Sequence, residues 1–261
     1  MQKFHMISGL PRSGSTLLSS ILNQNPRFSA GISNPLYFLM KNAIRAFSEN
    51  AESTQCSEQK RLNVLKGVIQ SYYQDDSAEV VFNTSRTWTA ELPLMNILVP
   101  NAKVICCVRD IGWILDSFEQ LYNENPTIYS NNMYGSLSRK MDTNIYMRTK
   151  NFMHEDGSFV AAYNSLKTAY YSEYNNKLIF IEYEHLTNDP QKTIEKIYNF
   201  IDEPHFNHDF DDVEVSYDEY DQAVQVKGLH NVRKKIAPNV RNTVVPPDIW
   251  KGFDGMEFWR A

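Results

Sequence analysis

The sequence predicts an α/β fold in which a central parallel β-sheet is flanked by helices. Short apolar runs typical of buried strands alternate with segments of helical periodicity over residues 1–200, and this alternation favours βαβ units. The composition, 42% hydrophobic and 22% charged, is that of an average globular protein. No internal repeat or Gly/Ser linker divides the 261 residues, so we expect one domain over residues 1–261.

The first elements alternate between strand and helix. Residues 3–10 form an apolar run that meets a Gly, Pro and Ser cluster, which indicates a buried strand entering a tight loop. Residues 15–26 place apolar side chains on one helical face, and an Asn-Pro pair ends this helix. Helical spacing predicts two further helices over 36–50 and 59–75, and the apolar run at 79–83 predicts the second strand.

The middle of the chain continues the pattern. Residues 91–98 predict a short helix that Pro100 closes. Residues 103–110 contain five consecutive apolar residues bounded by charge, which predicts a buried strand, and residues 112–122 follow with helical spacing. Residues 125–150 are rich in Asn, Ser, Tyr and Met with weak periodicity, and we expect a lid of loop and helix there.

The last predicted elements are a helix over 159–174, a strand over 177–186 and a helix over 189–201. Asp189 precedes Pro190 at the start of the last helix. This order predicts an aspartate N-cap followed by proline at the first helical position.

Cysteine usage and hydropathy limit the class of protein. The three cysteines, Cys56, Cys106 and Cys107, are too few for a disulfide framework or a four-ligand zinc site, so we expect no metal and a reduced compartment. Cys106 and Cys107 would point to opposite faces of a strand. No apolar run reaches the length of a membrane span, and the N-terminal residues do not resemble a signal peptide. We therefore expect a cytoplasmic protein without a membrane partner.

The charge is unevenly distributed. The net charge of −5 argues against nucleic-acid binding. Residues 202–221 carry nine carboxylates and no Lys or Arg, whereas residues 227–247 carry five basic residues and no acid. One interpretation is two solvated surface segments that neutralise each other. The other is a basic segment that binds a small polyanion.

The segment GLPRSGST at residues 9–16 has the features of a phosphate-binding loop. It lies between a predicted strand and helix, and two glycines five residues apart let its backbone amides face a ligand at the helix N-terminus. It nearly matches the Walker A motif, but Ser15 occupies the position of the lysine that reaches the far phosphates of ATP. The cation is instead Arg12, inside the loop, which suits a shorter anion than a triphosphate.

The segment GLPRSGSTLL resembles the 5′-phosphosulfate-binding loop of the sulfotransferases. These enzymes use 3′-phosphoadenosine 5′-phosphosulfate (PAPS) as donor and release 3′-phosphoadenosine 5′-phosphate (PAP). The resemblance implies a P-loop-like sulfotransferase fold. It also implies that six loop residues hold the 5′-phosphate of the donor: Pro11, Arg12, Ser13, Gly14, Ser15 and Thr16.

A second motif agrees with this family. The family places an Arg at the end of an apolar strand and a Ser eight residues later, and together they hold the 3′-phosphate. Arg109 and Ser117 have this spacing. An arginine fork and a short hydroxyl donor suit a phosphate group. Taken singly, Arg109 would pair with Asp110 and Ser117 would be an exposed helix residue.

Two weaker elements complete the resemblance. IEYEHLTNDP resembles the family segment whose tyrosine packs near the adenine, with Tyr183 in that position and His185 where Asp is usual. KGLHNVR resembles the basic loop that closes over the 3′-phosphate. Its implied binding residues are Lys227, Gly228, Leu229, His230 and Arg233. If the resemblance holds, the early loop and the Arg109–Ser117 couple grip the two anionic ends of one donor and must line one site.

The family resemblance also assigns catalytic roles. Arg12 would contact the bridging oxygen that leaves with the 5′-phosphate, and Arg86 would lie near the sulfuryl oxygens, unless it simply pairs with Glu91. The general base is missing from both family patterns, because Trp88 occupies the histidine slot of the small-molecule enzymes and residues 29–38 contain no acid. Glu91 and His154 are fallback candidates. An acceptor nitrogen or an acidic hydroxyl need not require a strong base.

The acceptor is the least determined part. Residues 31–35, GISNP, form a loop on the expected acceptor side, and similar bacterial and cyanobacterial sulfotransferases carry G-x-[ST]-S-P there with similar tails. That group includes enzymes that tailor secondary metabolites, among them guanidinium alkaloids such as saxitoxins. We therefore expect a small-molecule acceptor, and the acidic segment either attracts a cationic acceptor or is plain surface. The alternative is a protein-tyrosine sulfotransferase-like enzyme.

Three further possibilities stay open from the sequence. One is a P-loop nucleotide or small-molecule kinase, and another is a non-catalytic nucleotide-binding scaffold. The third concerns assembly, since residues 239–248 loosely match the dimer motif of cytosolic sulfotransferases: Thr243, Val244 and Asp248 fit, and Asn239 replaces the lysine. This match predicts a homodimer.

Overall fold

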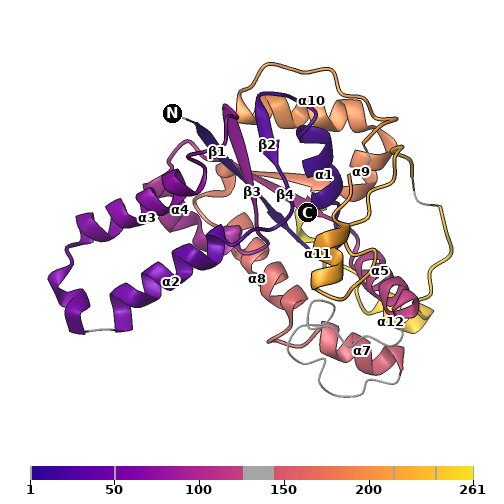
Figure 1. The fold of residues 1–261 in the computed structure, drawn as a ribbon. Coiled ribbons are helices and arrows are strands. Elements are labelled where there is room, and N and C mark those ends of the chain that lie inside the picture. The colour runs from indigo at the N-terminus through magenta and orange to yellow at the C-terminus, as the bar shows by residue number, and fades with distance from the viewer. Residues whose placement is uncertain (1, 50, 126–143, 214, 239, 261) are drawn as a thin grey trace.

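A computed structural model describes residues 2–49, 51–125, 144–213, 215–238 and 240–260. Within them lies one sheet of five parallel strands in the order β2-β3-β1-β4-β5. The strands are β1 (Lys3–Gly9), β2 (Phe28–Ala30), β3 (Val80–Thr84), β4 (Val104–Val108) and β5 (Leu178–Glu182). The predicted fold class, a central parallel sheet with flanking helices, is confirmed (Figure 1).

Helices connect and cover the strands. The α-helices are α1 (Ser15–Leu22), α2 (Leu36–Glu49), α3 (Glu58–Tyr72), α4 (Leu92–Leu98), α5 (Ile111–Glu124), α7 (Ile145–Phe152), α8 (Ser158–Tyr170), α9 (Tyr183–Asn188), α10 (Pro190–Ile201), α11 (Asp218–Ala223) and α12 (Pro247–Lys251). Short 3₁₀ segments are η1 (Ala51–Gln55), η2 (Trp88–Glu91), η4 (Asn175–Lys177) and η5 (Phe258–Arg260). As predicted, Asp189 caps α10 by accepting from the Lys192 amide.

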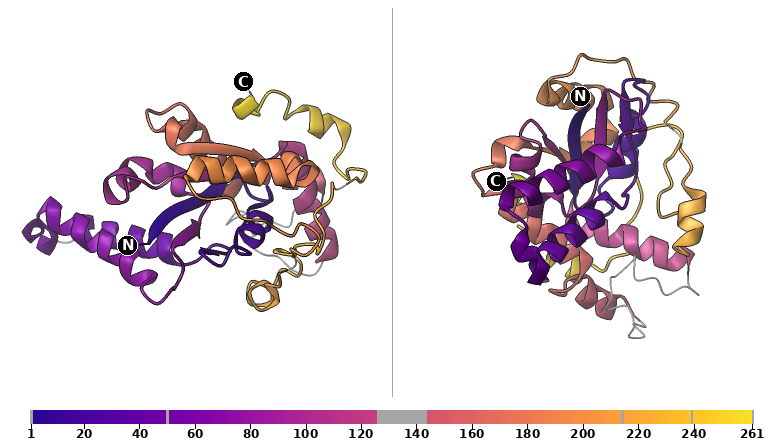
Figure 2. Two further views of the ribbon diagram at one scale, coloured as in Figure 1. Left: turned by 90° about the horizontal axis from the view of Figure 1, so that it is seen from above. Right: turned by 60° about the vertical axis from the view of Figure 1, so that its left-hand side comes forward.

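Two apolar layers hold the sheet between the helices. Helices α1, α9 and α10 bury their apolar faces against one side of the sheet, and α2, α3, α4, α5 and α8 cover the other side (Figures 1 and 2). Cys106 belongs to the second of these layers and its neighbour Cys107 to the first, as the period-two geometry of a strand requires. Burial raises the pKa of the Cys107 thiol to about 12, so this cysteine is a packing residue.

Two sequence predictions of strands need correction. The strand expected over 177–186 ends at Glu182, because the backbone turns into α9 at Tyr183 and the Thr187 hydroxyl bonds back to the Tyr183 carbonyl. The edge strand β2 was not predicted, since three residues are too few to show a periodic pattern. Of the lid expected over 125–150, residues 126–143 lie outside the described part, and the helical part is α7.

The acidic and basic segments lie against each other. Backbone hydrogen bonds join Val213 to Lys234 and Ile236 to Phe210, and Lys235 pairs with Asp211 at 2.8 Å. The interpretation of two mutually neutralising surface segments therefore holds for this stretch. No helix among the described residues is long and apolar enough to cross a membrane.

Candidate active site

A cavity of about 330 Å³ opens at the carboxyl ends of the central strands. The strand order reverses around β1, and ligands of parallel α/β sheets bind at such a switch point. The cavity wall contains residues from every element that the sequence had singled out: Arg12, Gly14, Ser15, Thr16, Arg86, Arg109, Ser117, Tyr183, Gly228, Leu229, His230 and Arg233. Segments separated by up to about 220 residues in sequence thus line one site.

The phosphate loop has the backbone that its glycines predict. Gly9 and Gly14 have φ of 113° and 89°, in the region that favours glycine. A Cβ at Gly9 would lie 2.1 Å from the Cys107 carbonyl oxygen, and one at Gly14 would lie 2.8 Å from the Tyr183 ring. Arg12 also adopts a positive φ of 57°. The loop therefore packs tightly on β4 and on Tyr183, with its amides at the start of α1.

Arg12 joins three parts of the site. Its Nε donates to Ser117 Oγ at 3.0 Å, and Nη1 donates to the Leu229 carbonyl of the C-terminal loop. Burial, together with the neighbouring Arg86 and Arg109, lowers the pKa of Arg12 to about 10, so the side chain is still cationic at neutral pH. Burial and neighbouring cations disfavour the charged form of Arg12, and an anion that binds beside it stabilises that charged form.

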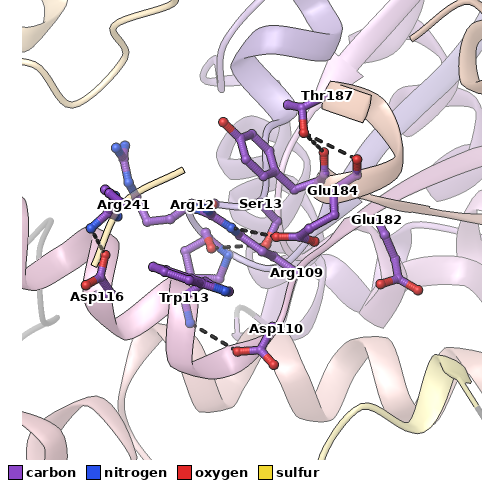
Figure 3. A network of polar contacts seen from close by, with 12 residues as sticks. Arg12, Ser13, Arg109, Asp110, Trp113, Asp116, Glu182, Glu184, Thr187 and Arg241 are labelled. Carbon is purple, nitrogen blue, oxygen red and sulfur yellow. Dashed lines mark hydrogen bonds and ion pairs between the residues drawn. The ribbon is translucent and has the colours of Figure 1, made fainter. Parts of the chain in front are cut away.

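Arg109 lies at the end of β4, where the sequence placed it. Its expected alternative, an ion pair with Asp110, is not what the structure contains: Asp110 caps α5 by accepting from the Trp113 amide. Arg109 instead lies 3.3 Å from Glu184 (Figure 3). It also stacks over the Tyr183 ring at 4.1 Å. These two contacts, both from α9, hold the guanidinium beside the phosphate loop.

Arg86 is an exposed cation on the cavity wall. The alternative pairing with Glu91 is not formed, because the Glu91 carboxylate binds Lys41 at 2.8 Å and Tyr37 at 3.3 Å. Within the described parts of the chain, no ion pair links either Arg86 or Arg12 to a carboxylate. Five arginines line the cavity, and three of them follow the central strands: Arg12, Arg86 and Arg109. Among these three, in the described parts of the chain, only Arg109 has an ion pair, with Glu184.

The remaining sequence candidates divide between the wall and its supports. Ser13 and Pro11 are buried behind the loop, where the Ser13 hydroxyl donates to the Pro11 carbonyl. Lys227 is exposed and does not line the cavity. Its backbone amide donates to Asn125 Oδ1 and its carbonyl accepts from Asn125 Nδ2, and these two hydrogen bonds fix the C-terminal loop. Arg233 is exposed at the cavity wall.

The candidate bases from the sequence lie outside the cavity lining. Glu91 is engaged by Lys41, as described above, and His154 interacts with its neighbour Asp156. Trp88, in the histidine slot of the family, is fully buried and donates to Asn83 at 2.9 Å. The structure therefore places none of these three side chains where a base must act.

The loop at residues 31–35 contributes to the cavity wall. Ile32 and Ser33 line the cavity, and the Gly31 carbonyl accepts hydrogen bonds from Ser19 and Thr84. These bonds fix the loop against α1 and β3. Ile32 and Ser33 thus share the cavity wall with Arg86.

Long-range contacts add residues that the sequence did not reveal. Buried Asp116 on α5 pairs with Arg241 and accepts from Thr243 Oγ1 at 2.9 Å, which anchors the C-terminal segment over the site (Figure 3). Arg241 itself lines the cavity. Asp221 on α11 binds His230. Asp116 is more than 100 residues from its partners, and only the basic character of the 227–247 segment indicated that contact. Asp221 is nine residues from His230, in a stretch without periodic pattern.

Comparison with known proteins decides the family. The model of the Sulfotransferase family matches residues 6–208. The chain belongs to the sulfotransferase family. No curated protein sequence matches it significantly.

Two solved structures with TM-scores above 0.5 share this fold. The sulfotransferase domain from the curacin biosynthetic pathway is 15% identical, with 98% of this chain and 92% of that domain covered and a TM-score of 0.54. A sulfotransferase from Alicyclobacillus acidocaldarius is 16% identical, with 85% and 90% covered and a TM-score of 0.51. A mouse sulfotransferase complexed with PAP is 14% identical, with 79% and 60% covered and a TM-score of 0.47.

The cavity has groups that suit an anionic ligand. It offers glycine-loop amides at the start of α1 and three guanidiniums that converge from β1, β3 and β4. The Arg12–Ser117 hydrogen bond brings the predicted 5′-phosphate loop into direct contact with the predicted 3′-phosphate couple. The two places are neighbours in one cavity.

Proposed function

We propose that this sulfotransferase moves a sulfuryl group from PAPS to a hydroxyl or amine of a small-molecule acceptor. The observation that carries the proposal is the convergence of Arg12, Arg86 and Arg109 in one cavity with the glycine loop. Sulfuryl transfer places negative charge on the oxygen that leaves with the 5′-phosphate. Cations fixed beforehand around that oxygen lower the barrier, because they need no rearrangement in the transition state.

The residues have separate roles in this proposal. Gly14, Ser15 and Thr16 hold the 5′-phosphate through the loop and the start of α1, and Arg12 faces the bridging oxygen. Arg109 and Ser117 hold the 3′-phosphate, and the Tyr183 ring, already stacked on Arg109, borders the adenine. The acceptor enters along Ile32 and Ser33 beside Arg86.

The acceptor class rests on the resemblance of the 31–35 loop to that of enzymes acting on natural products, guanidinium alkaloids among them. The acidic segment is a weak attractor for such cations, because Asp211 and Asp212 pair with Lys235 and Lys234. Cytoplasmic location and homodimerisation stay predictions. In the structure Thr243 and Val244 of the dimer motif both bond to Asp116 of their own chain, Asp248 accepts from Tyr146, and Asn239 lies outside the described residues.

Thermal unfolding tests the donor first. PAP without metal is expected to stabilise the protein, by about 2.7 kcal/mol at one hundred times its dissociation constant, whereas ATP with Mg²⁺ is not. A shift with ATP·Mg²⁺ alone would indicate a kinase, and no shift with either nucleotide would indicate a scaffold.

Transfer is tested with labelled PAPS and a panel of phenols, alcohols, amines, guanidinium compounds and cell extract. Mass spectrometry should find an added sulfuryl group on a small molecule. Labelling confined to protein tyrosines would instead support the protein-directed alternative.

A further inference from the structure

A histidine–aspartate pair lies in the wall of the cavity. His230 Nδ1 is 2.7 Å from Asp221 Oδ1, and the second carboxylate oxygen accepts from the His230 backbone amide at 3.0 Å. Asp221 is only 3% exposed, and the His230 side chain is 16% exposed. An ionised carboxylate can only accept, so Nδ1 carries the proton and Nε2 is the ring nitrogen available to bind one.

The pair is fixed between the donor side and the acceptor side. The carbonyl of Leu229, the residue before His230, accepts from Arg12. On the other side, the His230 ring contacts the Tyr217 ring, and the Tyr217 hydroxyl bonds to the backbone of Ile32 in the acceptor loop. His230 therefore lies between the cation proposed to face the leaving oxygen and the loop proposed to border the acceptor.

The charges around His230 favour its neutral form. Burial lowers its pKa below 6.5, Arg12 and Arg86 lower it further, and Asp221 opposes these effects. The other groups that face the ring are Tyr217 and Tyr220. At neutral pH the imidazole is thus uncharged, which is the form that accepts a proton.

We propose that His230 is the general base of the transfer and that Asp221 positions it. This rests on the proposed function. The acceptor oxygen bonds to sulfur while the bond from sulfur to the bridging oxygen breaks, and its electron pair stays on the 5′-phosphate. The acceptor proton moves to His230 Nε2, and the resulting imidazolium is stabilised by Asp221 until it returns the proton to solvent. This base takes the role that Trp88, Glu91 and His154 cannot fill.

The same contacts would also serve a purely structural role, in which Asp221 only clips the C-terminal loop. The two roles differ in their dependence on the acceptor. A base matters greatly for a weakly acidic hydroxyl and little for an acidic one. A clip matters equally for both.

The first test needs no turnover. The protein is labelled with ¹⁵N-histidine, PAP is added, and the imidazole signals are followed by NMR, with His230→Gln assigning the signal among six histidines. The expected result is a neutral ring protonated at Nδ1 near pH 7, and loss of this single tautomer in Asp221→Ala. A ring protonated at Nε2, or an imidazolium at this pH, would overturn the proposal.

The second test compares PAPS transfer to phenol and to the more acidic 4-nitrophenol. His230→Gln should reduce transfer to phenol about 10²–10⁴-fold and transfer to 4-nitrophenol less than about tenfold. The PAP dissociation constant should stay within about threefold. Equal losses with both phenols, or a weakening of PAP binding as large as the loss of transfer, would contradict a base. The matched control is His205→Gln, because His205 is exposed and bonds to Asn199.

The pH profile separates the two residues of the pair. Transfer by the wild type should fall as the pH decreases through the His230 pKa, below 6.5, and His230→Gln should lack this fall. Asp221→Asn should lower kcat more than it raises KM and move the fall to lower pH, because the carboxylate raises the histidine pKa. Asp254→Asn, on the surface, should change neither. An unmoved profile in Asp221→Asn would assign Asp221 a structural role only.

Failure of the proposed function gives a different result. If the wild type does not bind PAP, the donor assignment falls and the base role falls with it. If it binds PAP but transfers to neither phenol, the NMR tautomer alone decides whether His230 can act as the base.

Discussion

The parallel strands begin at what we call the amino edge of the sheet and end at its carboxyl edge, and these two regions differ in how their cations are paired. At the amino edge, Lys3, Arg27 and Lys103 precede or begin β1, β2 and β4, and each is bound by a carboxylate of the loop after α10. Glu203 pairs with Lys3 at 2.5 Å and with Arg27 at 3.0 Å, and Asp202 pairs with Lys103 at 2.7 Å. At the carboxyl edge, Arg12, Arg86 and Arg109 have one paired carboxylate between them in the described chain, Glu184.

This difference separates structural charge from binding charge. A cation that is neutralised within the chain contributes to holding the loop that neutralises it. Cations without such partners repel one another, and this repulsion destabilises the unliganded protein. An anion that binds among them offsets the repulsion. The carboxyl edge therefore has the electrostatics of a binding site, and the amino edge has those of a structural joint.

The largest effect is expected at the carboxyl edge. Arg12→Ala should reduce transfer about 10²–10³-fold with a modest loss of PAP affinity. The reason is that the Arg12 guanidinium stabilises the negative charge that develops on the leaving oxygen in the transition state. Rates with labelled PAPS and PAP titration measure the two quantities. Arg45→Ala is the control, since Arg45 is 70% exposed on α2. An Arg12→Ala enzyme with the wild-type rate would remove Arg12 from the reaction.

The amino edge should respond in stability and not in binding. Glu203→Gln leaves Lys3 and Arg27 without their fully buried partner, and we expect a loss of about 2–4 kcal/mol in the free energy of unfolding. Glu79→Gln removes a 63% exposed partner of Arg27 and should cost far less stability, because water screens that pair.

Denaturant unfolding with and without PAP checks both variants. The stabilisation that PAP provides should be the same in each variant as in the wild type. If Glu203→Gln lost PAP binding while staying folded, the two edges would not be independent.

The smallest effect is expected at a cation that both lines the cavity and has a carboxylate partner. Lys235 lines the cavity but is paired with Asp211, both about 70% exposed. Asp211→Asn should release this cation and tighten PAP binding by less than about threefold, with the gain lost at high salt. Titration calorimetry at two salt concentrations measures it, and weaker binding in the variant would contradict the interpretation.

Local patterns explain which parts of the site could be predicted. The glycine loop and the Arg109–Ser117 couple each occur in a short segment whose spacing is set by one strand, one turn and one helix, so each motif is visible in the sequence. The family resemblance then implied that the two line one site. The parallel sheet with flanking helices follows from the alternation of apolar runs in the same way, whereas the strand order does not.

The remainder of the site depends on contacts between distant segments. His230 was assigned to a phosphate-binding loop, and its partner Asp221 was counted only as one of nine acidic residues. The Asp116–Arg241 pair joins a buried helix position to a segment with no periodic pattern. Such pairings leave no periodic pattern in the sequence, because they depend on how the C-terminal segment packs over the sheet.

The central claim is that two anionic ends of one donor are held by different groups within a single cavity. It is tested most directly by measuring the affinity of the wild type and Arg109→Lys for PAP and for adenosine 5′-phosphate, which lacks the 3′-phosphate. We predict that Arg109→Lys weakens PAP binding about tenfold or more and leaves the binding of adenosine 5′-phosphate nearly unchanged, because lysine cannot reproduce the guanidinium fork. An equal loss for both nucleotides, or no loss for PAP, would contradict the claim.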